Sequence, residues 1–214
     1  MNDDSNLAVA IKSIVPTDPE SARALIRVVD DFCPHFQQLR QEAVLAESNP
    51  FRHEGILYPD MARSQASWAE PLFQLHLGPV ARKSDYYRLY RRGSKQQTYI
   101  HSDIGIADLS AILSLGDPDH HNGSIVFWRH KKTGWILPGG GKVGDPACED
   151  GLYENRWEAW QTVEMAANRC VVFPAVLYHS RYPNKWNKNY PRKVQVFFLN
   201  ILSVTQSSDQ ELRR

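Results

Sequence analysis

The hydrophobic pattern of the chain changes at about residue 83, and this change limits the possible folds more than any other feature of the sequence. Before it, apolar residues recur mostly at helical spacing. After it, short segments either alternate apolar with polar residues or form continuous apolar runs, as β-strands do. Glycine, proline and aspartate separate these segments. The predicted strands are residues 84–93, 96–103, 107–117, 123–131, 169–179 and 191–204.

Helices followed by a series of short strands predict a mainly β protein, a β-sandwich or jelly roll with helices packed outside it. A length of 214 residues fits one domain overall. We expect residues 1–82 to form an N-terminal strand and helices packed on the core. Residues 83–205 would form the core itself, and residues 206–214 a polar tail.

The N-terminal part contains one clear helix signal. Thr17 and Glu20 have the spacing of a capping box, and apolar residues at helical spacing follow as far as Phe32. The other elements expected outside the six strands are a strand over residues 7–16, a helix over 35–48, a loop over 49–65, a helix over 65–80, and a short helix or mixed structure over 153–167.

Composition excludes several classes of protein. Lys plus Arg number 25 against 24 for Asp plus Glu, which argues against a dedicated nucleic-acid binder. The three cysteines are far apart without a CxxC spacing, as expected for reduced thiols in a cytoplasmic protein. The acidic N-terminus is unlike a signal peptide, and no apolar run is long enough to span a membrane. The sequence does not indicate an oligomeric state.

The chemistry of the chain centres on His101 and Asp103, which lie two residues apart in a predicted strand. Their side chains therefore point to the same face, and a buried imidazole and carboxylate need a compensating partner. A metal ion is one such partner, and His179, at the end of an apolar strand, is the candidate third ligand. Two histidines and one carboxylate suit Fe(II) and leave coordination positions open. The alternative is a structural His101–Asp103 hydrogen bond, with His179 in a surface loop.

Several segments together resemble the core of the iron(II)- and 2-oxoglutarate-dependent dioxygenases. The resemblance covers roughly residues 83–203 and is carried by YIHSD, ADLSAILSL, NGSIVFW, NRCVVFPAVLYHSRYP and RKVQVFFLN. It implies a double-stranded β-helix, a cupin-like jelly roll, with an N-terminal helical extension. It also implies that His101, Asp103 and His179 bind Fe(II), with 2-oxoglutarate and O2 as cosubstrates. The expected reaction hydroxylates an unactivated C–H bond of a small molecule, amino acid or peptide, and releases succinate and CO2.

In that family a basic residue in the last strand pairs with the far carboxylate of 2-oxoglutarate. Arg192 and Lys193 are the candidates, and only one of two adjacent strand residues can face inward. We choose Arg192 because its planar guanidinium can hold a carboxylate at two points. Tyr99 shares the predicted face of His101 and could donate a hydrogen bond to the cosubstrate. Arg88 and Tyr90 share a strand face and could line the same pocket.

Two other functions stay open at the level of sequence. One is a cupin-like metal enzyme that does not use 2-oxoglutarate, and the other is a non-catalytic β-sandwich binding module. The long connection over residues 132–151, with its glycine-rich PGGGKVG, is either a lid that closes over the metal or a remote surface loop. In the first case we expect Trp135 or Trp186 to contact the closed site.

Overall fold

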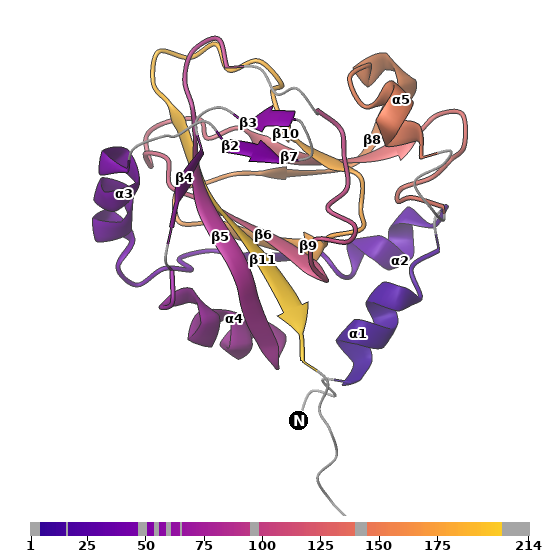
Figure 1. Ribbon diagram of the computed structural model, residues 1–214, viewed down its shortest axis with the longest axis horizontal. Coiled ribbons are helices and arrows are strands. Elements are labelled where there is room, and N and C mark those ends of the chain that lie inside the picture. The colour runs from indigo at the N-terminus through magenta and orange to yellow at the C-terminus, as the bar shows by residue number, and fades with distance from the viewer. Residues whose placement is uncertain are drawn as a thin grey trace, which may run out of the picture.

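In the computed structural model of the chain, two antiparallel sheets lie one above the other, with helices along their outer sides (Figure 1). The described residues are 5–15, 17–46, 51–53, 56–58, 61–64, 66–94, 99–139 and 145–202. In this part of the chain, every helix is too short or too polar to cross a lipid bilayer.

The larger sheet has six strands. Their order is β1 (Arg27–Val29), β9 (Cys170–Pro174), β6 (Leu109–Ser114), β11 (Arg192–Ile201), β5 (Val80–Tyr90) and β4 (Met61–Arg63). The smaller sheet has the order β10 (His179–Tyr182), β7 (Ser124–His130) and β8 (Trp157–Glu164). A separate hairpin pairs β2 (Phe51–His53) with β3 (Ile56–Tyr58).

From β6 onward the chain moves back and forth between the two sheets. Strand β6 belongs to the larger sheet, β7 and β8 to the smaller, β9 to the larger, β10 to the smaller and β11 to the larger. This winding defines a double-stranded β-helix, so the predicted fold class is confirmed. The helices are α1 (Ser5–Lys12), α2 (Pro19–Arg23), α3 (Phe36–Leu45), α4 (Ala69–Leu77), α5 (Pro146–Asp150) and the 3₁₀ turn η1 (Glu154–Arg156).

Two apolar clusters hold these layers together. One packs α3 and α4 against the outer face of the larger sheet and includes Leu39, Phe73 and Phe197. The other includes Phe127 of β7 and Phe173 of β9, whose rings meet edge to face with centroids 5.1 Å apart. Because these two strands come from different sheets, this contact joins the sheets to each other.

The N-terminal segment differs most from its prediction. Residues 7–16 begin as helix α1 and not as a strand, because Leu7 and Ile11 lie one turn apart and pack together on the larger-sheet cluster. The next helix is only five residues long and is capped by Asp18 rather than Thr17. The chain then leaves the helical path, and Arg27–Val29 pairs with β9 as the edge strand of the larger sheet. Pairing at a sheet edge here overrides the apolar spacing of the local sequence.

Other segments also gain strands that their sequence did not indicate. Within the predicted loop over 49–65, Met61–Arg63 pairs with β5 and extends the larger sheet. Residues 157–164 form a strand, with one register shift against β7, where a helix or mixed structure was expected. Conversely, the predicted strand over 96–103 is reduced to a single bridge at His101, with residues 95–98 outside the described part. The helices predicted over 35–48 and 65–80 are present but shorter, as Phe36–Leu45 and Ala69–Leu77, and Val80 already belongs to β5. The tail over 206–214 lies outside the described residues.

Candidate metal centre and pocket

Backbone hydrogen bonds bring His101, Asp103 and His179 together between the sheets. His101 and His179 form an isolated β-bridge, in which each backbone N–H donates to the carbonyl of the other, at 3.1 and 2.8 Å. The Asp103 N–H donates to the carbonyl of Ala175 at 2.8 Å. The sequence pair and the distant histidine are therefore held in place by main-chain contacts, which do not depend on any bound ion.

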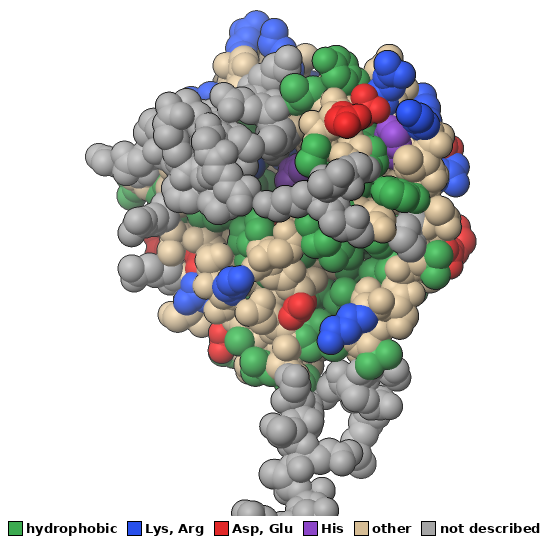
Figure 2. Space-filling view, turned by 45° about the vertical axis from the view of Figure 1, so that its right-hand side comes forward, with side chains coloured by type: hydrophobic (Ala, Val, Ile, Leu, Met, Phe, Trp, Pro, Cys, Tyr) green, Lys and Arg blue, Asp and Glu red, His purple; other side chains and the backbone are tan. Residues whose placement is uncertain are grey.

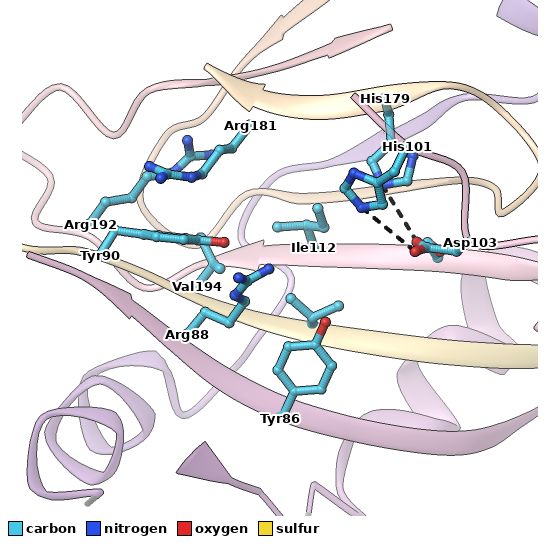
Figure 3. A pocket seen from close by; sticks show the side chains of 12 residues that line it. Tyr86, Arg88, Tyr90, His101, Asp103, Ile112, His179, Arg181, Arg192 and Val194 are labelled. Atoms are coloured by element: carbon cyan, nitrogen blue, oxygen red, sulfur yellow. Dashed lines mark hydrogen bonds and ion pairs between the residues drawn. The ribbon is translucent and has the colours of Figure 1, made fainter. Parts of the chain in front are cut away.

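The donor atoms of the three side chains face one another. His101 Nε2 lies 3.7 Å from Asp103 Oδ1, and His179 Nε2 lies 3.5 Å from Asp103 Oδ2 (Figure 3). One ligand atom from each residue lies within 4.8 Å of the other two. The arrangement joins two nitrogens and a carboxylate on one side of a common centre, which is the donor set of a facial triad.

Further hydrogen bonds orient these ligands. The Nδ1 atoms of His101 and His179 lie 3.1 and 2.9 Å from the carbonyl oxygens of Tyr99 and Leu177. A carbonyl accepts only, so each Nδ1 carries the proton and each Nε2 directs a lone pair at the centre. Ser110 Oγ donates to Asp103 Oδ2 at 2.7 Å.

The surroundings of His101 favour a neutral imidazole. Burial lowers the pKa of His101 to about 4, helped by the neighbouring His179 ring. The two ring centroids are 4.6 Å apart, and the Phe173 ring lies 4.7 Å from that of His179. A neutral imidazole is the form that binds a metal ion, so His101 does not have to lose a proton before it binds a metal ion at neutral pH.

Arg192 is the most buried of the arginines that line the pocket next to the triad, with 2% of its surface exposed, and it lies at the far end of that pocket (Figure 3). Its Nη1 and Nη2 donate to the carbonyls of Tyr182 and Ser124, at 3.3 and 3.2 Å. Gly123 makes room for it, because a Cβ at that residue, whose φ is +75°, would lie 2.9 Å from Nη1. Burial, together with the positive charges of Arg181 and Arg88, lowers the pKa of Arg192 to about 10, which still leaves it cationic.

The structure separates Arg192 from the other two candidates for cosubstrate binding. Lys193 is half-buried next to Arg40 and Asp117, and burial and the Arg40 charge lower its pKa. Tyr99 is fully buried, but it packs edge to face on Trp128, with ring centroids 6.3 Å apart. Neither residue is among those that line the pocket beside the triad. The expectation that Tyr99 shares the inward face of His101 came from treating residues 96–103 as a regular strand.

One pocket joins the triad to Arg192. Figure 2 shows a histidine side chain deep in a hollow on one face of the molecule, and Figure 3 shows the walls. The strand alternation explains its composition, since every second residue of β5, β10 and β11 faces it. The pocket is lined by Tyr86, Arg88, Tyr90, His101, Asp103, Ser110, Ile112, His179, Arg181, Arg192, Val194 and Val196.

Arg181 is a pocket residue that the sequence reasoning missed. It follows His179 by two residues in β10, so both side chains face inward. That spacing was the available signal, but the predicted strand ended at His179. The Arg181 guanidinium lies 3.9 Å from the centroid of the Tyr90 ring, and that of Arg88 lies 5.0 Å from it. The predicted pocket positions of Arg88 and Tyr90 are confirmed.

Neither tryptophan of the lid hypothesis lines the pocket. Trp135 packs on Gly139, where a Cβ would lie 2.4 Å from the indole ring. Trp186 is fully buried, and its Nε1 donates to the carbonyl of Tyr190 at 2.6 Å. Residues 140–144 of the long connection lie outside the described part of the chain. Closure of this connection over the metal stays a prediction.

No protein-family model matches this sequence, and no curated protein matches it at a significant level. Solved structures do match its fold. The non-haem α-ketoglutarate-dependent epimerase SnoN from nogalamycin biosynthesis aligns with a TM-score of 0.54 at 16% identity, over 85% of this chain and 84% of its own.

Two further enzymes have a similar structure. EctD from S. alaskensis with bound Fe aligns with a TM-score of 0.53 at 16% identity, over 88% of this chain and 78% of its own. A 2OG-Fe(II) oxygenase family oxidoreductase from Burkholderia pseudomallei aligns with a TM-score of 0.50 at 10% identity, over 92% of this chain and 90% of its own. The protein therefore has the double-stranded β-helix fold of the Fe(II)- and 2-oxoglutarate-dependent oxygenases.

Proposed function

We propose that the protein is an Fe(II)- and 2-oxoglutarate-dependent oxygenase. The observation that carries this proposal is a single pocket with two kinds of binding group. His101, Asp103 and His179 form one end, and the buried guanidinium of Arg192 forms the other. The fold supports it as well, because the solved structures that resemble this chain include one of EctD with 2-oxoglutarate and 5-hydroxyectoine.

The triad suits Fe(II) by the chemistry of its donors. His101 and His179 offer neutral imidazole nitrogens, and Asp103 offers one anionic oxygen. Three protein ligands leave further coordination positions for a chelating cosubstrate and O2. The Ser110 hydroxyl and the two backbone carbonyls behind the histidines hold the ligands in their binding orientation.

Arg192 fits the far carboxylate of 2-oxoglutarate. It is buried, cationic and anchored by backbone carbonyls, so its position is fixed before the cosubstrate arrives. Its Nε has no hydrogen-bond partner among the described residues, and a buried donor of this kind is satisfied by an arriving acceptor. The residue two positions later is Val194, which adds an apolar wall where a small hydroxyl residue is usual in the family.

Bound iron and 2-oxoglutarate together supply the oxidising chemistry. Once bound by the triad and Arg192, they would allow oxidation of a C–H bond coupled to the conversion of 2-oxoglutarate and O2 into succinate and CO2. The protein would hold the reactants in place. It would also limit the access of water, since Ile112, Val194 and Val196 provide apolar walls between the two ends of the pocket. Hydroxylation of a small molecule, amino acid or peptide is the expected outcome. Desaturation, epoxidation and ring formation use the same groups and depend on how the substrate is placed.

Two rival functions make different demands on the pocket. A cupin-like enzyme without 2-oxoglutarate has no need of a buried arginine facing the metal ligands. A non-catalytic binding module has no need of three metal-binding donors held by dedicated hydrogen bonds. The presence of both features in one pocket favours the oxygenase.

The test is the formation of succinate from 2-oxoglutarate. Purified protein loaded with Fe(II) should bind 2-oxoglutarate under anaerobic conditions and form succinate slowly when O2 is admitted. N-oxalylglycine should block the reaction, and the Asp103→Ala variant should not catalyse it. If the iron-loaded protein binds no 2-oxoglutarate, the cupin-like alternative replaces the oxygenase. If the protein binds no iron, the binding module does.

A further inference from the structure

The pocket contains more guanidinium groups than the proposed cosubstrate uses. Arg88, Arg181 and Arg192 come from three different strands, β5, β10 and β11, and all three line it. Their exposed fractions are 7%, 6% and 2%, so each charge lies inside the protein. Bound 2-oxoglutarate would have one carboxylate away from the metal, and Arg192 is placed to receive it.

The three guanidinium groups do not converge on one point. Tyr90 keeps two of them apart, because Arg181 and Arg88 both lie against its ring (Figure 3). Figure 3 shows Arg181 beside Arg192 at the end of the pocket remote from the triad. Arg88 lies on the other side of the Tyr90 ring, nearer the middle of the pocket. A single carboxylate at Arg192 would therefore not occupy Arg88.

The walls around Arg88 are apolar and aromatic. Tyr86 precedes it by two residues on the same face of β5, and Val194 is its cross-strand partner on β11. Ile112 of β6 lies between Arg88 and the triad in Figure 3. A molecule placed here would meet an apolar surface over its body and one guanidinium at its edge. A guanidinium has five donors, so contacts within the protein do not prevent it from holding an anion as well.

We propose that the primary substrate is an organic anion with an apolar body, and that Arg88 binds its anionic group while Arg192 holds 2-oxoglutarate. This inference rests on the proposed function and specifies its substrate class. A carboxylate and a phosphate or sulfate ester share the required chemistry. Anchoring the anionic end at Arg88 directs the apolar part of the substrate past Ile112 toward the metal ligands.

The test uses a complex in which no turnover occurs. The full-length protein is loaded with Mn(II) and saturated with N-oxalylglycine, so that Arg192 is occupied. Benzoate, benzamide and inorganic phosphate are then titrated separately by calorimetry. Benzoate and benzamide have the same ring and differ in charge, and phosphate has no apolar body. We expect benzoate to bind at least about tenfold more tightly than benzamide. Tighter binding of phosphate than of benzoate would assign the substrate to the phosphate esters.

Substitutions of single residues then show which arginine binds the anion. Arg88→Gln should weaken benzoate by about tenfold or more and leave N-oxalylglycine within about twofold. Arg192→Ala should weaken N-oxalylglycine instead. Lys193 is next to Arg192 in β11 but lies outside the pocket, so Lys193→Gln should change neither benzoate binding nor N-oxalylglycine binding. Thermal unfolding of each variant checks its fold, and Arg88→Lys keeps the charge if Arg88→Gln is unstable. That variant should still prefer benzoate to benzamide.

Each contrary result is informative. Equal binding of benzoate and benzamide, or benzoate binding that survives Arg88→Gln, overturns the inference. If Arg88→Gln weakens N-oxalylglycine as much as Arg192→Ala does, Arg88 belongs to the cosubstrate site and the inference is wrong. If the Mn(II) protein does not bind N-oxalylglycine but binds benzoate through Arg88, the oxygenase proposal fails and the anion site remains.

Discussion

The two ends of the pocket are built in different ways. At the metal end, His101 and Asp103 come from one short segment, and a β-bridge adds His179 directly beside them. At the arginine end, Arg88, Arg181 and Arg192 come from three strands that are far apart in sequence. The metal end therefore has a compact signature in the sequence, whereas at the arginine end the sequence indicated Arg88 and Arg192 but not Arg181. A donor set for an ion can be recognised from spacing, whereas a binding surface for an organic anion depends on the packing of the strands.

The largest effect is expected at the metal end. Asp103→Ala removes the one anionic ligand of the triad. We expect loss of turnover and a fall of more than about a hundredfold in Fe(II) affinity, because losing a ligand costs more than losing a hydrogen bond to a ligand. The fold should survive, because the apolar clusters between and outside the sheets do not involve this side chain. Metal analysis and calorimetry check the first point, and circular dichroism the second. Wild-type Fe(II) affinity in this variant would rule out the triad.

The second-largest effect is expected at the arginine end of the pocket. Arg192→Ala should weaken 2-oxoglutarate binding by more than about tenfold, since truncating one partner of a buried charge pair costs roughly 2–5 kcal/mol. Fe(II) affinity should remain close to that of the wild type, because Arg192 is not a ligand. Titration of 2-oxoglutarate into the anaerobic Fe(II) protein measures this. A parallel loss of iron would mean that the two ends are not independent.

Ser110→Ala tests how far orientation matters at the metal end. Its hydroxyl donates to Asp103 Oδ2 at 2.7 Å, and loss of such an outer hydrogen bond typically costs about 10–100-fold in metal affinity. We expect the lower part of this range, because the Asp103 backbone stays bonded to Ala175. Competition with a chelator of known affinity gives the value. No change would indicate that the backbone alone orients Asp103.

The smallest effect is expected from Lys193→Ala. The side chain is half-buried beside Arg40 and Asp117 and does not line the pocket. A partly exposed cation outside the pocket contributes less than about 1 kcal/mol to binding there, so 2-oxoglutarate affinity should change by less than about fivefold. The same titration as for Arg192→Ala provides the comparison. A larger loss than in Arg192→Ala would show that the facing of strand β11 has been assigned incorrectly.

The strand alternation made much of the candidate site predictable. Arg88 and Tyr90 of β5 both line the pocket, and Arg192 of β11 lines it where Lys193 does not. His101 and Asp103 also converge as predicted, although their segment is not a regular strand. Tyr99 is the exception, because the described residues 99–103 contain a single bridge at His101 and no regular strand. Arg181 was missed for a related reason, since β10 begins at His179 and continues inward beyond it.

By itself, the sequence determined the mainly β fold, the three candidate metal ligands and the inward position of Arg192. The fold class and the His101–Asp103 pair follow from periodicity and spacing, which are local properties of the chain, whereas the choice of Arg192 follows from the resemblance to the dioxygenases and from the planar shape of its guanidinium. Only the tertiary structure decided that Arg27–Val29 and Met61–Arg63 join the larger sheet, and that Arg181 and Arg88 lie against the ring of Tyr90. Edge pairing and pocket lining arise from contacts between segments remote in sequence. Their free energies depend on the partner that each segment meets, and so no local pattern records them.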